Sequence, residues 1–381
     1  MAACRSVRVL GMYILGAVCS YAQQLPQHSS QTAEKVPLEE VSSALVSSLP
    51  AESIAMPVLC DADGNILFRL AMPDTGVEDP VSVSSDGKTI TRFGKEKIND
   101  ITRPVPLSMF LSQSEVYILT RGSIPLNSDV KWRRPDGEVE THPASKGAWF
   151  VARFRRDGTY LSAVPLELSF KPFHLGVFQN GDFLISGADP TTDEPRVAIV
   201  GSNGQLRKSV ELKGDVHARN ESDASASEKD DPTSLPRSKT WEGFAESLRD
   251  VVSTSQIAPD GPNLLLLRPV NGPIFSISPS GEVRVHNLKV KSDFRLFTIK
   301  ATSGSWIVEF INDLPDGTAH FATYAFDPET GAPLREYFFP TDLGFGLACT
   351  DGDKFTFVRA NVEGKSLELM KLRPAAFPKS D

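Results

Sequence analysis

The side chains best suited to binding chemistry lie in one long connection between apolar runs. Residues 122–147 hold aromatic, basic and titratable side chains, namely Trp132, Arg133, Arg134 and His142. A tryptophan offers a stacking surface, arginines donate paired hydrogen bonds to carboxylates, and a histidine titrates near neutral pH. The set suits carboxylates, sugars or peptides. The same residues also fit a solvated hairpin whose tryptophan packs on the rim of the fold, and the sequence leaves both interpretations open.

Acidic and amide side chains gather in two shorter connections. They are Asp189, Asp193, Asn312 and Asp313. Oxygen ligands of this kind are preferred by hard divalent cations, so these residues are candidates for ligand binding and for a divalent metal. Their spacing does not define a set of metal ligands. A calcium loop starting at Asp61 is not favoured, because position twelve, which needs a glutamate, is Met72.

Motifs of established catalytic chemistry are absent from the sequence. The chain has no HExxH, GxSxG, CxxC or phosphate-binding GxxxxGK[ST] pattern. Its histidines are scattered, and three of them fall within strand patterns, where a structural hydrogen-bonding role is favoured. Catalytic residues therefore stay unassigned, and no cofactor is identified.

The N-terminus is typical of a secretory signal peptide over residues 1–22. Arg5 and Arg8 precede a short apolar run, and small residues stand at the minus-three and minus-one positions before Gln23. A membrane anchor is the weaker alternative, because the run is about half as long as a spanning helix requires. The sequence thus predicts a secreted or periplasmic protein with no membrane span.

Charge and cysteine content narrow the class of protein further. Removal of residues 1–22 leaves 38 basic and 48 acidic residues, a net charge of −10, which disfavours nucleic acid as a partner. It also leaves only Cys60 and Cys349. An oxidising compartment would allow these two cysteines to form a disulfide, and two buried free thiols are the alternative. A fold of this size must rest on an apolar core.

Hairpins with glycine-containing turns organise the rest of the chain. In residues 57–93, two successive hairpins turn at Asp63-Gly64 and at Asp86-Gly87. This four-strand unit recurs six times, the last time with three strands, at a period of about 40 to 50 residues where no insertion intervenes. The pattern predicts an all-β fold, a six-bladed β-propeller of four-stranded antiparallel blades, over residues 53–372. A β-sandwich array is the alternative architecture.

The turns of this repeat resemble those of NHL-type bacterial propellers. In that family an apolar strand leads into Asp-x-Asp-Gly-Asn, a second apolar strand and another Asp-Gly hairpin. Cys60–Phe68 and Phe178–Ile185 match this pattern best. The resemblance covers roughly residues 55–372 and implies an architecture, not an activity.

Several segments lie outside the strand pattern. Residues 213–250 form a polar insertion that begins with too few apolar side chains to fold alone and ends, at 240–250, with helical spacing. In the N-terminal segment 23–52, residues 37–49 also have helical spacing. The outer strand missing from the sixth unit must come from the same region if the ring closes in the common way, so a helix and a closing strand both stay open. Residues 373–381 form a C-terminal tail.

Two hypotheses for function follow. In a propeller, the long connection 122–147 and the insertion 213–250 belong to the same face. Function commonly lies on elaborated loops held by a rigid scaffold. The first hypothesis is an exported binding or scaffold module that holds a peptide, glycan or partner protein on that face. The second is a metal-dependent hydrolase or lyase with its site in the central channel. This hypothesis is suggested by the acidic residues of the two shorter connections. A convergent set of channel carboxylates would favour the enzyme.

Overall fold

The computed structural model is a propeller of β-strands. The signal peptide expected at residues 1–22 and the insertion expected at 213–250 lie outside the residues that it describes. No helix long and apolar enough to cross a membrane occurs in the described part of the chain. The described residues are 33–46, 49, 53–61, 63–72, 76–94, 98, 101–112, 114–133, 138–192, 194–212, 256–267, 273–290, 295–313, 319–339, 346–361 and 366–375.

Four separate four-stranded sheets form the first four blades, and in each the strands follow chain order. The first blade contains β2 (Ser53–Cys60), β3 (Ile66–Met72), β4 (Gly76–Val83) and β5 (Ile90–Arg92). The second contains β6 (Thr102–Leu111), β7 (Glu115–Arg133), β8 (Val139–Arg155) and β9 (Tyr160–Leu166). The third contains β10 (Lys171–Val177), β11 (Phe183–Ala188), β12 (Pro195–Val200) and β13 (Leu206–Val210). The fourth contains β14 (Gln256–Asp260), β15 (Asn263–Leu267), β16 (Ile274–Ile277) and β17 (Val283–His286).

The remaining strands form one eight-stranded sheet in the order β18-β19-β20-β21-β1-β24-β23-β22. One half contains β18 (Arg295–Ala301), β19 (Trp306–Asp313), β20 (Ala319–Phe326) and β21 (Pro333–Phe338). The other contains β22 (Gly346–Asp351), β23 (Lys354–Asn361), β24 (Ser366–Pro374) and the N-terminal β1 (Glu34–Val46). The sequence predicted six separate sheets, whereas here the fifth and sixth repeat units share one sheet, because β1 pairs with the outer strand of each.

Strand β1 decides between the two interpretations of the N-terminal segment. It runs parallel to β21 through Glu34–Pro37 and antiparallel to β24 from Leu38 to Val46. The helical interpretation is therefore wrong over these residues. An isolated helix this short is marginal in water, whereas two open sheet edges offer β1 a complete ladder of hydrogen bonds. The helical spacing is incidental, since Val41 and Leu45 are 53% and 65% exposed.

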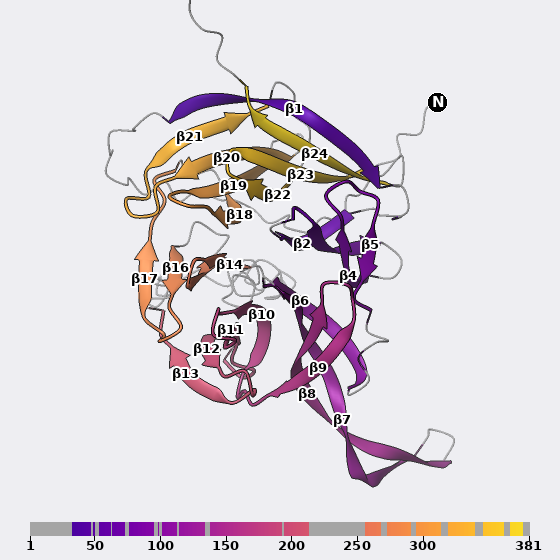
Figure 1. Ribbon diagram of the computed structural model, residues 1–381. Coiled ribbons are helices and arrows are strands. Elements are labelled where there is room, and N and C mark those ends of the chain that lie inside the picture. Colours follow the sequence, from indigo (N-terminus) through magenta and orange to yellow (C-terminus); the bar gives the residue numbers. More distant parts are fainter. Residues whose placement is uncertain are drawn as a thin grey trace, which may run out of the picture.

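The innermost strands form a closed ring. Each contacts the next, and the last, β22, contacts the first, β2; in ring order they are β2, β6, β10, β14, β18 and β22. Figure 1 shows the sheets arranged around this common centre. The all-β propeller prediction is confirmed. The core fills the spaces between neighbouring sheets, so that Phe68 of the first blade, Phe154 of the second and Leu369 of β24 belong to one buried cluster.

The composition of each strand follows its distance from the centre. All residues of β11, FLISGA, are buried, because neighbouring blades cover both faces of a sheet near the axis. The outer strand β13, LRKSV, is exposed except at Val210. Apolar inner strands and polar outer strands thus alternate along the chain, which is the repeat visible in the sequence.

Glycine is required where one blade touches the turn of the next. Gly204, in the β12–β13 turn, has φ +87°, and a Cβ on it would lie 1.8 Å from the carbonyl oxygen of Pro165 in the second blade. The Gly204 carbonyl in turn accepts a hydrogen bond of 2.9 Å from the Glu167 N–H. A positive φ and a backbone contact together exclude any side chain at this position.

The role of β1 can be tested with two substitutions in that strand. Leu38 is 3% exposed and packs in a cluster with Phe355 and Phe357, so Leu38→Ala should lower the free energy of unfolding by about 2 to 5 kcal/mol. Val41→Ala, at an exposed position, should change it by less than about 0.5 kcal/mol. Urea denaturation at fixed pH measures both. Equal effects of the two variants would contradict the pairing of β1.

Candidate functional site

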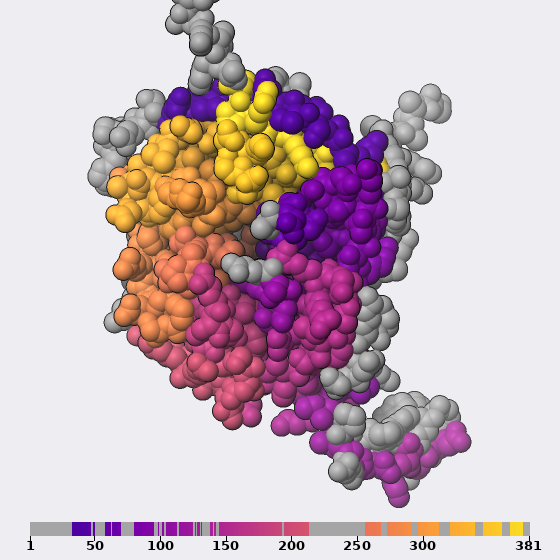
Figure 2. Space-filling model, viewed as in Figure 1, coloured from indigo at the N-terminus to yellow at the C-terminus, as the bar shows by residue number. Residues whose placement is uncertain are grey.

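The second blade carries a long two-stranded arm that contains the aromatic and basic residues singled out in the sequence. Strands β7 and β8 pair from Glu115↔Arg155 out to Arg133↔Val139, with one register shift between Pro125 and Asp129. Beyond Ser123 and Gly147, the described residues of the two strands pair only with each other. We call residues 124–146 the arm. Figures 1 and 2 show it extending well away from the disc of blades.

The sequence candidates occupy the outer part of the arm. Trp132 pairs with Glu140, and His142 with Val130, so they stand on opposite strands near the tip. Arg133 is the last residue of β7. Arg134 and the predicted turn lie outside the described residues. The structure therefore brings Trp132, Arg133 and His142 onto one hairpin, and their roles in binding stay predictions.

The arm exposes aliphatic side chains and open sheet edges. Ile124, Leu126 and Val139 are 41%, 45% and 48% exposed, among the most exposed large hydrophobic residues described. A two-stranded ribbon buries little of its own surface and is marginally stable alone. Its outer N–H and C=O groups have no neighbouring strand in the described structure, which makes the edges templates for pairing with another chain.

The described acidic and amide candidates, Asp189, Asn312 and Asp313, belong to two different sheets, and neither sheet carries the arm. Asp189 follows β11, where its Oδ1 accepts the backbone N–H groups of Thr191 and Thr192 at 2.9 and 3.2 Å. These bonds, aided by Arg196, lower its pKa. Asp189 thus stabilises its own turn. Asn312 and Asp313 end β19 in another sheet, opposite His320 and Ala319, and Asp193 lies outside the described residues.

No group of three or more His, Cys, Asp or Glu side chains could hold a metal ion among the residues described. The acidic connections therefore supply no described ligand set. The prediction of a divalent metal is therefore supported only by the types of the acidic and amide residues in the sequence.

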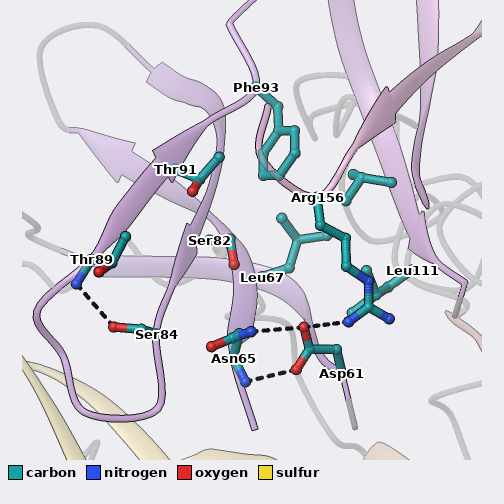
Figure 3. Close-up of a pocket in the computed structure, with 11 residues that line it drawn as sticks. Asp61, Asn65, Leu67, Ser82, Ser84, Thr89, Thr91, Phe93, Leu111 and Arg156 are labelled. Atoms are coloured by element: carbon teal, nitrogen blue, oxygen red, sulfur yellow. Dashed lines mark hydrogen bonds and ion pairs between the residues drawn. The ribbon is translucent and has the colours of Figure 1, made fainter. Parts of the chain in front are cut away.

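A small polar pocket lies between the first and second blades. Its volume is about 100 Å³, and Asp61 and Arg156 form an ion pair at its wall. Figure 3 shows Arg156 and Asn65 directed at the Asp61 carboxylate. Arg156 Nη1 donates to Asp61 Oδ2 at 2.6 Å, and Asn65 Nδ2 donates to the same oxygen at 2.9 Å. Arg156 Nη2 donates to the Ser112 carbonyl at 3.0 Å, so these charged groups mainly tie the turns of the two blades together.

A second set of chemically competent side chains, buried or half-buried, lies near the centre, where β18, β22 and β2 meet. We call it the seam cluster; its members are Cys60, Lys300, Glu309 and Cys349. Lys300 Nζ donates a hydrogen bond of 2.6 Å to the carbonyl of Val58, so it reaches from β18 to β2. Cys60 and Cys349 come from β2 and β22, and their thiols hydrogen-bond to each other. The structure thus brings these two sequence candidates into direct contact.

Glu309 is the fully buried carboxyl of the seam cluster. It has no exposed surface, and both of its carboxyl oxygens lie 3.0 Å from the N–H of Leu347 in β22. Burial raises the pKa of Glu309 to about 8, although the hydrogen bond from Leu347 and the charge of Lys300 lower it. The carboxyl is therefore largely protonated at neutral pH, and its chemistry is that of a buried proton donor.

Sequence reasoning missed Lys300 and Glu309. Each is a charged residue inside an apolar strand pattern, in FTIKA and WIVEFI respectively. Long charged side chains are rarely buried without a partner, so a single charge within such a run was a usable signal. Their partners, Val58 and Leu347, come from other repeat units and could not be paired with them before the fold was known.

The closed ring of inner strands defines the chain as an all-β propeller protein. No family model and no curated protein matches the sequence, so the NHL-type likeness remains one of turn residues. Among solved structures, the chain is similar to a putative exported protein from Bacteroides fragilis, with 11% identity, a TM-score of 0.44 and coverage of 89% of this chain and 96% of that one. It is also similar to virginiamycin B lyase from Staphylococcus aureus, with 10% identity, a TM-score of 0.41 and coverage of 89% and 100%. Likenesses at this level say nothing of activity.

The buried carboxyl should make stability depend on pH. Because folding raises the pKa of Glu309 from 4.5 to about 8, the folded protein binds the extra proton between these values, and stability is lost as the pH rises through the folded pKa. The free energy of unfolding should therefore fall between about pH 5 and pH 8 more steeply than in Glu309→Gln. Urea denaturation across this range measures it. The exposed control Glu211→Gln should follow the unmodified protein; a Glu309→Gln curve parallel to both would contradict the assignment.

Proposed function

We propose that the protein is an exported, non-enzymatic binding module that holds an extended segment of a partner protein along the arm. The observation that carries this proposal is the arm itself, a two-stranded ribbon that leaves the disc with exposed Ile124, Leu126 and Val139. Aliphatic side chains on an unsupported ribbon gain most by packing against another protein. The propeller is the rigid base from which the arm projects.

Strand addition is the mode of binding that the arm supports best. An extended segment pairs its backbone with a free sheet edge and places alternate side chains against the ribbon face. Proline has no N–H to donate, so Pro125 and Pro143 interrupt such pairing near the middle of the arm. The open stretches are then Asp129–Arg133 of β7 and the start of β8 from Val139. The matching partner is an extended segment with apolar residues at alternate positions.

A partner protein is favoured over a glycan by the kind of surface described. Glycan sites commonly rely on aromatic platforms, whereas the exposed large residues of the arm that the structure describes are aliphatic. Trp132 is the candidate that would extend the proposal to sugars. The signal-peptide pattern supports an interaction outside the cytoplasm. Among the described residues, no set of metal ligands supports the alternative of a hydrolase or lyase.

Cross-linking at the arm tests the proposal in cells that make the protein. A photoreactive p-benzoylphenylalanine at Leu126 should cross-link one reproducible protein, identified by mass spectrometry. Leu206 of β13 is 47% exposed and lies in another blade, so the same substitution there should give no such product. Absence of a product at Leu126, or the same product at both positions, would count against the arm as the binding surface.

A shortened variant separates binding from folding. Ser123 and Gly147 face each other across the hairpin, so residues 124–146 can be replaced by an Asn-Gly turn that closes a two-residue hairpin. Its affinity for the cross-linked protein should fall at least about 100-fold, the loss of roughly 3 kcal/mol of binding free energy. Its thermal midpoint should stay within a few degrees, because the described residues of the arm pair with no strand outside it. Unchanged affinity with an intact fold would overturn the proposal.

A further inference from the structure

The two cysteines of the seam cluster meet where the ring closes. Cys60 is the last residue of β2 and Cys349 lies within β22, and these are the first and last innermost strands. Cys349 is 5% exposed and Cys60 is half-buried, and both belong to the same apolar cluster. The cysteine thiols are free and hydrogen-bonded to each other. They stand in separate repeat units but within bonding reach.

Local irregularities bring the two thiols together. The first hairpin has residues 61–65 between the paired Cys60 and Ile66, whereas the last has only 352–353 between Asp351 and Lys354. Cys60 precedes its turn glycine, Gly64, by four residues, whereas Cys349 precedes Gly352 by three. The unequal turn lengths account for this offset of one residue. The register of β22 also shifts between Leu347 and Cys349. Such a bulge re-aims the side chain that follows it.

The surroundings make the two thiols chemically unequal. The hydrogen bond from Cys349 lowers the pKa of Cys60 to about 7, aided by the charge of Lys300 and opposed by burial and by Asp61. The same hydrogen bond, together with burial, raises the pKa of Cys349. The negative charge of Asp61 is offset by Arg156. A thiolate attacks disulfides and a thiol does not, so Cys60 is the thiol prepared to react first.

We propose that Cys60 and Cys349 are a two-step oxidation site that forms a disulfide across the seam, with Cys60 as the attacking and Cys349 as the resolving cysteine. The oxidant is a disulfide, either a small molecule or a disulfide-bearing oxidoreductase. The Cys60 thiolate attacks one of its sulfurs, forms a mixed disulfide and releases one thiolate, which takes a proton from water. Cys349 then loses its proton to solvent and attacks the Cys60 sulfur, which releases the second thiol. Two cysteines are oxidised and one disulfide is reduced to two thiols.

The cross-link would hold the ring independently of β1. It joins positions 60 and 349, so the covalent loop runs from the end of β2 to β22 and includes the four innermost strands between them, β6, β10, β14 and β18. Closing a loop of this length restricts the unfolded chain strongly. Oxidation should therefore raise the urea midpoint by roughly 1 M relative to the reduced protein. This inference does not depend on the arm or on the proposed function.

Trapping of the mixed disulfide tests the assigned order. The full chain carrying Cys4→Ser and Cys19→Ser retains only the two seam cysteines. With Cys349→Ser added, incubation with oxidised glutathione at about pH 7 should give a stable glutathione adduct on Cys60, read by intact mass. With Cys60→Ser added instead, Cys349 should react at least about tenfold more slowly. Equal rates, or faster reaction of Cys349, would overturn the order.

The chain with both seam cysteines tests the bond itself and does not depend on the folding of the single variants. After the same treatment, alkylation without reductant should label no thiol, and prior reduction should restore two labels. Peptide mapping should recover the Cys60 and Cys349 peptides joined. Two labelled thiols after exposure to the oxidant would overturn the proposal.

Discussion

The structure depends on one strand that joins two repeat units into a single sheet. Strand β1 continues the sheet at β21 with parallel pairs and at β24 with antiparallel pairs. A ring of blades is held mainly by apolar packing between neighbours, and that packing is complete only when the last unit touches the first. By covering the outer edges of β21 and β24, β1 fixes the fifth and sixth repeat units relative to each other. The contact between β22 and β2 then closes the circle on the inside.

Polar groups near the axis add specificity to this closure. Desolvation makes a buried carboxyl or ammonium group costly unless it is partnered. The partner of Glu309 is a backbone N–H of β22, and that of Lys300 is a carbonyl of β2. Both lie in repeat units other than those of the charged residues. A ring assembled in another order would leave the buried Glu309 and the half-buried Lys300 without these partners, so the cost of desolvation falls on the wrong arrangements and not on this one.

Much of the fold was visible in the sequence because the repeat is local. Turns such as Asp86-Gly87 appear as predicted, with Gly87 at φ 75°. The fate of the N-terminal segment was not visible, because the apolar spacing of Leu38, Val41 and Leu45 fits a helix, while the sheet edges that make it a strand lie some three hundred residues away. The joined fifth and sixth units could not be foreseen for the same reason.

The candidate site also has parts that the sequence could predict and parts that required the fold. Adjacency of Cys60 and Cys349 followed from counting repeat units, because the first and last units of a ring are neighbours. The arm was recognisable as a hairpin in the sequence, but its length depends on how far β7 and β8 continue to pair beyond the blade. Glu309 and Lys300 required the fold, since their partners are distant in sequence. The binding roles of Trp132, Arg133 and His142 are predictions from the sequence.

The shared sheet also sets the order in which the molecule can be completed. A chain that emerges from its N-terminus presents β1 first, yet the longer part of the ladder for β1 is β24, the last strand to appear. The first four sheets can fold as they emerge, because each is contiguous in sequence. Strand β1 must wait, exposed, through the synthesis of all of them. A product truncated before β24 lacks the only antiparallel partner of β1, so closure itself distinguishes a finished chain from an interrupted one.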